Sequence, residues 1–383
     1  MANAAKPRAA VITSGNPRDV ATWSGIPFHM LQVLESRFDV VDVVEAPWPW
    51  WFHKFGKLLK LAALGRWEYH FSAGYTAFAG RRLVAQLKAA RPDVVLAISA
   101  SPMAHLLVDD FRVVNIADAT VRSMLGYYDS FTQHMGGDGS AADAIEAKVV
   151  SGAFLSLYPS AWARDSALND YGADPARTQI IEWGSNIAAA ATEPRQLPDG
   201  PLRLLFVGIE FDRKGGPLAI ATAAALTARG IDCRLDIVGA SADAFDGTVP
   251  ANVEFHGFVS KATPEGRAKI AALFADANFF LLPTRAECFG IVFAEAASRG
   301  LPTISYATGG VPSAVLSGVT GQLLPLDAGA DAFADAIAAI VASPARYTEM
   351  SRAALEDARV RLDWGVWADR VAAAVTAQLV IDG

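Results

Sequence analysis

Short apolar runs, rich in branched and aromatic side chains, alternate with longer alanine-rich stretches along nearly the whole chain. In the first half the runs predict strands at residues 9–13, 40–45, 93–98, 113–117, 153–158 and 179–183. In the second half they predict strands at 203–207, 234–238, 253–255, 278–282, 303–306 and 322–324. Strands that alternate with helices form βαβ units, and parallel strands buried on both faces give continuous apolar runs. The pattern therefore predicts an α/β protein with parallel sheets.

The length of 383 residues exceeds what one hydrophobic core usually serves, so we expect two domains. The stretch 188–200, AAAATEPRQLPDG, is rich in Ala and Pro and lacks an apolar period. We interpret it as an interdomain linker, with an ordinary long loop as the alternative. The expected domains are Rossmann-like and span 1–190 and 200–364, and a helix at about 365–383 is expected to pack back on the first. Open α/β sheets bind ligands at the carboxyl ends of their strands, so we look for function in the loops that follow strands.

The composition excludes several classes of protein. A net charge of −7 argues against a nucleic-acid partner, which would require a strongly basic face. No apolar run is long enough to span a bilayer, and the first ten residues lack the features of a secretory signal. The two cysteines, Cys233 and Cys288, match neither a metal site nor a disulfide framework. We therefore expect a cytoplasmic protein without a bound metal.

The segment 283–302, PTRAECFGIVFAEAASRGLP, carries the strongest candidate chemistry. A strand is predicted to end at its start, Glu287 falls in the loop, and a helix is predicted to begin near Gly290 with Glu295 on its flank. Amides that are free at the start of a helix favour an anion, and glycine lets a ligand approach the backbone closely. The amides in question belong to Phe289, Gly290 and Ile291. The layout predicts a pyrophosphate seat between two hydroxyl-binding carboxylates, as a nucleotide sugar requires. The alternative is that Glu287 caps the helix and Glu295 is solvated.

A second candidate segment is 203–216, RLLFVGIEFDRKGG. The predicted strand closes at Gly208, and Arg213 and Lys214 lead into a helix that begins near Pro217. Two cations at the carboxyl end of a strand could neutralise a diphosphate leaving group. A solvated basic turn is the alternative.

A third and weaker candidate is the loop 22–30, TWSGIPFHM, which follows the first predicted strand. Gly25 lies two residues before Pro27, and a helix is predicted to follow. The loop is compatible with a cover over a bound ligand or with any βα connection.

These segments, in this order, resemble the family-four retaining glycosyltransferases, which have the two-domain GT-B fold. The hallmark E-x-F-G-x-x-x-x-E reads ECFGIVFAE in this chain. Supporting similarities are YPSAWARDSALNDYG at 158–172, IIEWGSNI at 180–187, VEFHGFV at 253–259, TGGVPSAVLSGVTGQLLP at 308–325 and the terminal helix at 364–379. The resemblance covers the chain well from Pro159 onward and only loosely before it.

The resemblance implies roles for matching residues. Glu287 would contact hydroxyls of the donor sugar, Glu295 would hold the ribose hydroxyls, and Lys214 would hold the diphosphate. The amides of 289–291 would meet the sugar and phosphates, with Gly208 at the strand end beside them. The family usually has Arg directly after that glycine, where this chain has Ile209, and Arg213 is our candidate substitute.

Two further regions follow from the resemblance. The stretch 257–261, with Phe258 and Val259, occupies the region that usually reads the nucleobase, largely through backbone groups. Many relatives have His after a strand in the middle of the first domain, and VVNIADAT places Asp118 at about that position. Asp118 would position the donor or activate the acceptor, and the alternative is that it caps the next helix.

The implied activity is α-linked transfer, with retention, of a sugar from a nucleoside diphosphate sugar to a hydroxyl of a glycan, lipid-linked or small-molecule acceptor. Family frequency puts UDP-sugars first and GDP-sugars second. The first domain would bind the acceptor and the second the donor. No Asp-x-Asp motif follows a strand, so we expect metal-independent transfer with no cofactor besides the donor. The resemblance favours a front-face mechanism over a covalent intermediate on Glu287.

The segment 47–71 combines many aromatic residues with regularly spaced lysines. It could form an amphipathic helix that lies peripherally on an anionic membrane, which would suit a lipid-linked acceptor. The alternatives are a helical flap over the acceptor site and aromatic stacking on a carbohydrate.

Two rival functions share the expected fold. A sugar-nucleotide epimerase would have the same layout but not this Glu–Glu spacing, and it would need no acceptor. A non-catalytic nucleotide-sugar-binding protein is the second rival, which the absence of Arg at Ile209 keeps open. A dehydrogenase is less consistent with the sequence, because no G-x-G-x-x-G opens a helix after an early strand.

Overall fold

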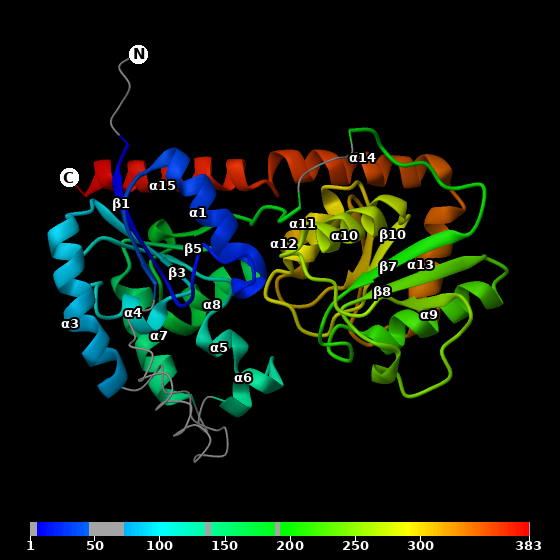
Figure 1. Cartoon of the computed structure of the whole chain (residues 1–383), viewed down its shortest axis with the longest axis horizontal. Helices are drawn as coiled ribbons and strands as arrows, with labels where there is room; N and C mark the ends of the chain where they lie inside the picture. The colour runs from blue at the N-terminus through cyan, green and yellow to red at the C-terminus, as the bar shows by residue number, and fades with distance from the viewer. Residues whose placement is uncertain (1–5, 46–72, 135–138, 188–191, 383) are drawn as a thin grey trace. The chain divides into compact units, whose positions relative to one another are not determined.

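The computed structural model describes residues 6–45, 73–134, 139–187 and 192–382 (Figure 1). The chain divides into two compact units. Unit 1 comprises Met1–Ile181 and Ala368–Gly383, and unit 2 comprises Glu182–Trp367. Each unit contains a parallel six-stranded sheet, and all of the predicted strands are present. The fold is therefore α/β with two Rossmann-like units.

In unit 1 the strand order is β2-β1-β3-β4-β5-β6. The strands are β1 (Arg8–Thr13), β2 (Asp39–Glu45), β3 (Val94–Ile98), β4 (Val113–Ile116), β5 (Leu155–Tyr158) and β6 (Thr178–Ile180). The helices are η1 (Thr22–Gly25), α1 (Ile26–Arg37), α3 (Ala73–Ala90), α4 (Ser101–Ala104), α5 (Val121–Met124), α6 (Asp129–His134), α7 (Ser140–Gly152), α8 (Ala161–Tyr171) and η3 (Pro175–Arg177), together with most of α15 (Trp364–Ile381). The central strands β3 to β5 are buried along their whole length, as the continuous apolar runs predict.

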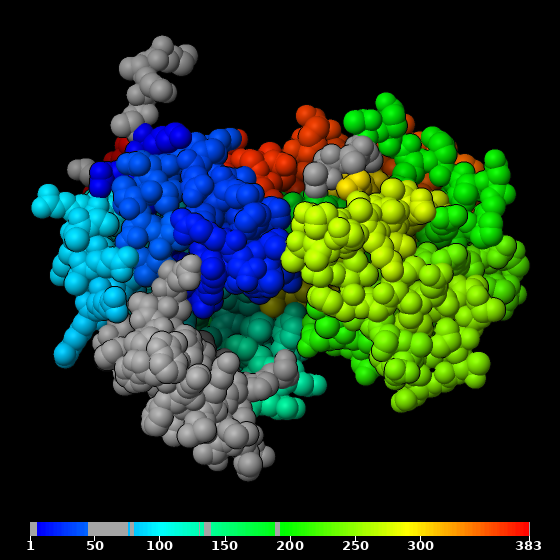
Figure 2. All heavy atoms as spheres, viewed as in Figure 1, coloured from blue at the N-terminus to red at the C-terminus, as the bar shows by residue number. Residues whose placement is uncertain are grey.

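In unit 2 the strand order is β12-β11-β10-β7-β8-β9. The strands are β7 (Leu202–Val207), β8 (Cys233–Val238), β9 (Val253–Phe255), β10 (Phe279–Leu282), β11 (Thr303–Tyr306) and β12 (Gly321–Leu324). The helices are α9 (Gly216–Ala228), η4 (Ala242–Ala244), α10 (Pro264–Asp276), α11 (Ile291–Ala297), α12 (Val311–Ala314), α13 (Ala330–Val341) and α14 (Pro344–Val360). In Figure 2 the yellow-green residues of α10 form part of the visible surface. Residues 292–297 of α11 are buried.

The predicted strand at 179–183 extends too far. β6 ends at Ile180, and the chain enters unit 2 at Glu182. Trp183 is buried in unit 2, where its ring meets the ring of Phe289 edge to face at 6.0 Å between centroids. Trp183, the last residue of this run, therefore serves the core of unit 2 and not the sheet of unit 1.

The change of unit falls before the segment 188–200 that we interpret as a linker. Residues 188–191 lie outside the described residues, and the remainder packs on unit 2. The guanidinium of Arg195 donates hydrogen bonds to the carbonyls of Phe274, Ala277 and Arg299, at 2.7–2.8 Å. These bonds satisfy carbonyls at two helix ends, which explains why this Pro-containing segment is held in place.

The segment 47–71 lies outside the described residues, so peripheral membrane contact stays a prediction. Among the described helices, none combines the length and the apolar character that crossing a bilayer would require.

Candidate functional site

Two loops at the carboxyl edge of the second sheet are joined to each other. β7 and β10 are neighbours, and the amide of Arg285, in the loop after β10, donates to the carbonyl of Arg213, in the loop after β7, at 2.9 Å. Gly215 has φ +79°, and a Cβ there would lie 2.1 Å from the carbonyl oxygen of Pro283. Only glycine fits this contact, so the segment 208–216 is fixed directly against the Glu287 loop.

Glu287 and Lys214 meet at this junction. Their side chains form an ion pair and are 11% and 14% exposed, respectively. The amide of Gly310, from the loop after β11, donates to the Glu287 carbonyl at 2.9 Å. Three loops therefore hold Glu287, and the N-cap position of α11 is Gly290.

Gly290 immediately precedes α11, as expected, with φ +81°. A Cβ at this position would lie 2.6 Å from the ring of Phe293 and 2.9 Å from Cγ of Glu287. Packing alone therefore favours glycine at this position, in addition to the close approach of a ligand that we expect there. Phe289 is buried, and Ile291 is partly exposed at the first position of the helix. Anion binding by the amides of 289–291 stays a prediction.

Glu295 lies in the middle of α11 and is 0% exposed, so the alternative that it is solvated is wrong. Lys261 forms an ion pair with its Oε1 atom. The second carboxylate oxygen, Oε2, is buried and has no hydrogen-bond partner among the described residues. Burial lowers the pKa of Arg299, while the charge of Glu295 acts in the opposite direction. A buried hydrogen-bond acceptor without a donor costs free energy, and a bound ligand could supply that donor. Among the described residues of unit 2, Glu295 is therefore the side chain that most directly indicates a ligand site.

Arg299 is a residue of this site that the sequence interpretation does not assign, whereas Lys261 ends the stretch 257–261 that the resemblance places at the nucleobase. Arg299 follows Glu295 by four residues and lies in the turn just after α11, which ends at Ala297. Lys261 comes from the loop after β9, and no local pattern links it to Glu295.

Arg213 is already engaged within unit 2. Its guanidinium forms an ion pair with Glu210 and donates to the carbonyl of Ala286. Its donors therefore hold the Glu287 loop in place. Ile209, at the position where the family usually has Arg, is 68% exposed.

Three glycines line the ends of β7, β8 and β9. The Gly208 amide donates to Val238 at 2.9 Å, and the Gly239 amide donates to Gly257 at 2.8 Å. A Cβ on Gly239, which has φ +105°, would lie 2.3 Å from the Gly208 carbonyl oxygen. The backbones therefore approach closely along this edge.

Apolar side chains project from the same edge, directly after two of these glycines. Ile209 follows Gly208, and Phe258, which is 71% exposed, follows Gly257. Val259 is partly exposed beside it. Exposed apolar groups beside a glycine-lined edge suit contact with a flat ligand such as a nucleobase.

Gly25 and Asp118 belong to unit 1. Gly25 is buried, has φ +83° and precedes α1, so the expected loop and helix are present. Asp118 follows β4 by two residues. The cap of α5 is Thr120, whose hydroxyl accepts from the Ser123 amide at 3.2 Å, so the alternative that Asp118 caps this helix is wrong.

Within the described ranges, one group has the spacing of metal ligands: Asp236, Glu254 and His256. His256 Nε2 lies 2.8 Å from Asp236 Oδ1, and Arg234 forms ion pairs with both carboxylates. Arg234 already compensates these charges, and the group belongs to β8 and β9, whereas Glu287 follows β10 and Glu295 lies on α11.

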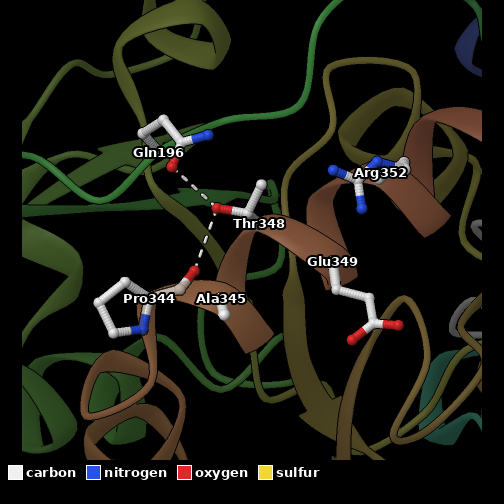
Figure 3. Close-up of a pocket in the computed structure, with 6 residues that line it drawn as sticks. All are labelled: Gln196, Pro344, Ala345, Thr348, Glu349 and Arg352. Atoms are coloured by element: carbon white, nitrogen blue, oxygen red, sulfur yellow. Dashed lines mark hydrogen bonds between the residues drawn. The ribbon is translucent and has the colours of Figure 1, made fainter.

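An open cavity of about 390 Å³ lies against α14 (Figure 3). It is lined by Gln196, Pro344, Ala345, Thr348, Glu349 and Arg352. The Thr348 hydroxyl donates to Gln196 at 2.9 Å, and none of the predicted site residues lines this cavity. We therefore do not place the nucleotide-sugar donor in this cavity.

The sequence of unit 2 matches a known family. Residues 201–343 fit the family model described as "Glycosyl transferases group 1". This segment contains Lys214, Glu287 and Glu295, and the resemblance to family-four glycosyltransferases is thereby confirmed.

The chain spans about half the length of the curated relatives that it matches. It is 31% identical over 206 residues to the D-inositol 3-phosphate glycosyltransferase of Kribbella flavida, covering 49% of this chain and 48% of that protein. It is also 31% identical over 222 residues to the protein of the same name from Pseudarthrobacter chlorophenolicus, covering 55% of this chain and 52% of that protein.

Solved structures resemble the chain over nearly its whole length. Sucrose-phosphate synthase from Thermosynechococcus elongatus has a TM-score of 0.70 at 18% identity, covering 99% of this chain and 100% of that one. HepE from Anabaena, in complex with UDP and glucose, has a TM-score of 0.64 at 15% identity, covering 96% and 99%. These likenesses show the fold, and the expected GT-B fold is confirmed.

Proposed function

We propose that the protein transfers a sugar from a nucleoside diphosphate sugar to an acceptor hydroxyl, with retention, and that unit 2 binds the donor. The unpartnered Oε2 atom of Glu295 is the observation that carries this proposal. Ribose hydroxyls would supply the donors that the buried carboxylate lacks. Lys261 covers the other oxygen with a side chain that is 30% exposed, and it would move aside as the ribose enters.

Lys214 is the cation that we assign to the diphosphate. Ile209 supplies no charge, and the donors of Arg213 are used by Glu210 and by the Ala286 carbonyl. Lys214 forms an ion pair with Glu287 at the carboxyl edge of the sheet, the one ion pair it makes among the described residues. A fixed cation that faces a departing diphosphate stabilises the charge that develops as the glycosidic bond breaks.

Glu287 would then accept hydrogen bonds from hydroxyls of the donor sugar, which orients the anomeric carbon. The leaving phosphate would take the acceptor proton on the same face, so that the configuration is retained without a covalent intermediate on the protein. We propose that no metal takes part, because Lys214 can supply the charge compensation. The exposed apolar pair Ile209 and Phe258 would contact the nucleobase.

UDP-sugars remain the first candidates for the donor and GDP-sugars the second, and a neighbouring fold, HepE, is described in complex with UDP and glucose. For the acceptor we propose a glycan, a lipid-linked sugar or a small molecule, positioned by unit 1 with Asp118. The relatives' name specifies an inositol phosphate, which is one member of the small-molecule class.

The test is release of nucleoside diphosphate from a panel of UDP-, GDP- and ADP-sugars, with and without acceptors and with and without a chelator. The proposal predicts release that depends on an acceptor, resists the chelator and yields a product with the donor's anomeric configuration. Conversion of the donor without acceptor would instead indicate an epimerase, a function that a structural neighbour of this fold is described as having. Binding without turnover on any acceptor would indicate a non-catalytic nucleotide-sugar-binding protein.

A further inference from the structure

Unit 1 buries four polar side chains that leave hydrogen-bonding atoms without a partner among the described residues. They are Asn115, Glu146, Ser156 and Tyr158, and each is at most 3% exposed. Both polar atoms of Asn115 and one atom of each other residue are affected. Proteins satisfy nearly all buried polar groups, because each unsatisfied group costs about 1–3 kcal/mol. Several unsatisfied groups in one place indicate hydrogen-bond partners that the protein chain does not supply.

The fold brings these four side chains together. β4 and β5 are neighbours, and Asn115 stands opposite Ser156 in the register of the pair. Tyr158 follows Ser156 by two residues, so its side chain points to the same face of the sheet. Glu146 lies on α7, which packs on β4. The Tyr158 hydroxyl lies close to Ser156 and Asn115, but without the geometry of a formed hydrogen bond.

Apolar residues surround this polar group on both sides. One buried cluster includes Val113 and Val149, and a second includes Ala117 and Val150. The polar side chains therefore interrupt a core that is otherwise apolar, at the ends of β4 and β5 that lie nearest to Asp118.

The charged and titratable groups around Glu146 make its anion unfavourable. Burial raises the pKa of Glu146 to about 7; a hydrogen bond with Ser101 acts in the opposite direction, and the charges of Asp143 and Asp118 add to the increase. The helices packed on α7 also bring His105 on the α4 side, Arg122 on α5 and Tyr171 on α8. Arg122 is paired with Asp143, so it does not compensate Glu146.

The chemistry of the four side chains selects the kind of ligand. The Asn115 amide can donate through its NH₂ group and accept through its oxygen, and both atoms lack a partner among the described residues. The two hydroxyls can both donate and accept, and Glu146 needs a donor when ionised and an acceptor when protonated. Water is the small molecule that meets all of these requirements, and buried waters typically make about three hydrogen bonds to such groups.

We propose that Asn115, Glu146, Ser156 and Tyr158 bind a buried cluster of water molecules in unit 1, and that Glu146 is the member of this cluster that holds a proton. The site belongs to the free protein and does not depend on the proposed transfer reaction. The charges of Asp118 and of an ionised Glu146 repel each other. The proton on Glu146 therefore removes a negative charge from the surroundings of Asp118.

The first experiment is a crystal structure of the wild-type chain at a resolution that shows ordered water. We expect waters within hydrogen-bond distance of Asn115, Ser156, Tyr158 and Glu146. Direct hydrogen bonds among these side chains with no water between them would overturn the proposal, as would a metal ion in the same place.

The second experiment follows the infrared band of a protonated carboxylic acid from about pH 5 to 9. We expect a band that disappears as the pH rises through neutrality in the wild type and is lost at every pH in Glu146→Gln. The matched control Glu35→Gln changes an exposed carboxylate on α1 and should leave the band intact. A wild-type band that does not titrate in this range, or one that persists in a folded Glu146→Gln, would overturn the role of Glu146. The wild-type measurement remains decisive if the variant does not fold.

Discussion

In unit 2 the carboxyl ends of the strands carry ion pairs, Lys214 with Glu287 and Lys261 with Glu295. In unit 1 the corresponding region carries Asp118 above a buried group of polar side chains that includes Glu146. Both sheets have six parallel strands. The same architecture therefore supports two different local chemistries, and the site residues, rather than the fold, carry the functional argument.

The two regions share one property, which is a buried polar atom without a partner. In the described part of unit 2 this holds for Glu295 and Arg299, and in that of unit 1 for the group around Glu146. The neighbours distinguish the two cases. Glu295 lies beside cations at the carboxyl edge, which suits an anionic ligand with hydroxyl groups, whereas the group around Glu146 is surrounded by apolar core, which suits enclosed water.

The largest expected effect is on catalysis in unit 2. Lys214→Ala should lower the rate of sugar transfer about a hundred- to a thousandfold, because it removes a fixed positive charge from the leaving group. Lys269→Ala removes an exposed lysine of α10 and should leave the rate unchanged. Steady-state kinetics on both variants checks this. Equal rates for Lys214→Ala and the wild type would remove Lys214 from the mechanism.

The next prediction compares glycines of the two units. Gly215 in unit 2 and Gly126 in unit 1 both have positive φ, +79° and +74°, but a Cβ at 215 meets Pro283 whereas a Cβ at 126 meets nothing within 4 Å. Gly126→Ala should cost about 1–2 kcal/mol from backbone strain alone, and Gly215→Ala roughly 1–3 kcal/mol more from overpacking. Chemical denaturation measures both. Equal costs would mean that the junction of the two loops is not rigid.

A third prediction concerns stability against pH in unit 1. The pKa of Glu146 is raised to about 7 in the folded chain, from 4.5 when unfolded, so the folded state keeps a proton that the unfolded state has lost. The stability that this proton confers is present below about pH 4.5 and is lost as the pH rises through 7. The loss amounts to about 3 kcal/mol, and Glu146→Gln should not show it. Denaturation curves at several pH values test this, and parallel curves for variant and wild type would contradict it.

The sequence predicts the strands well because buried parallel strands are continuous apolar runs. It fails at Trp183, since an apolar run does not show which unit buries its last residues. It also singles out Lys214, Glu287 and Glu295, because they lie within one motif or beside a strand end, and their roles stay predictions.

Other features depend on contacts that are distant in sequence. Lys261 reaches Glu295 from another loop, and Arg213 is engaged by Ala286, from the loop after β10. Asn115 and Ser156 are ordinary polar residues on separate strands, and only the register of the sheet makes them neighbours. No local pattern distinguishes them from solvated residues.

The most direct test of the central claim is calorimetric titration of the wild type and of Glu295→Gln with UDP and with GDP. Glu349→Gln, which changes a glutamate that lines the open cavity on α14, serves as the matched control. A hydrogen bond to a charged group contributes about 1.5–3 kcal/mol, so we expect one nucleotide to bind the wild type and the control alike and to bind Glu295→Gln about 10- to 100-fold more weakly. Equal affinity in all three proteins, or no binding of either nucleotide, would contradict the assignment of unit 2 as the donor-binding unit.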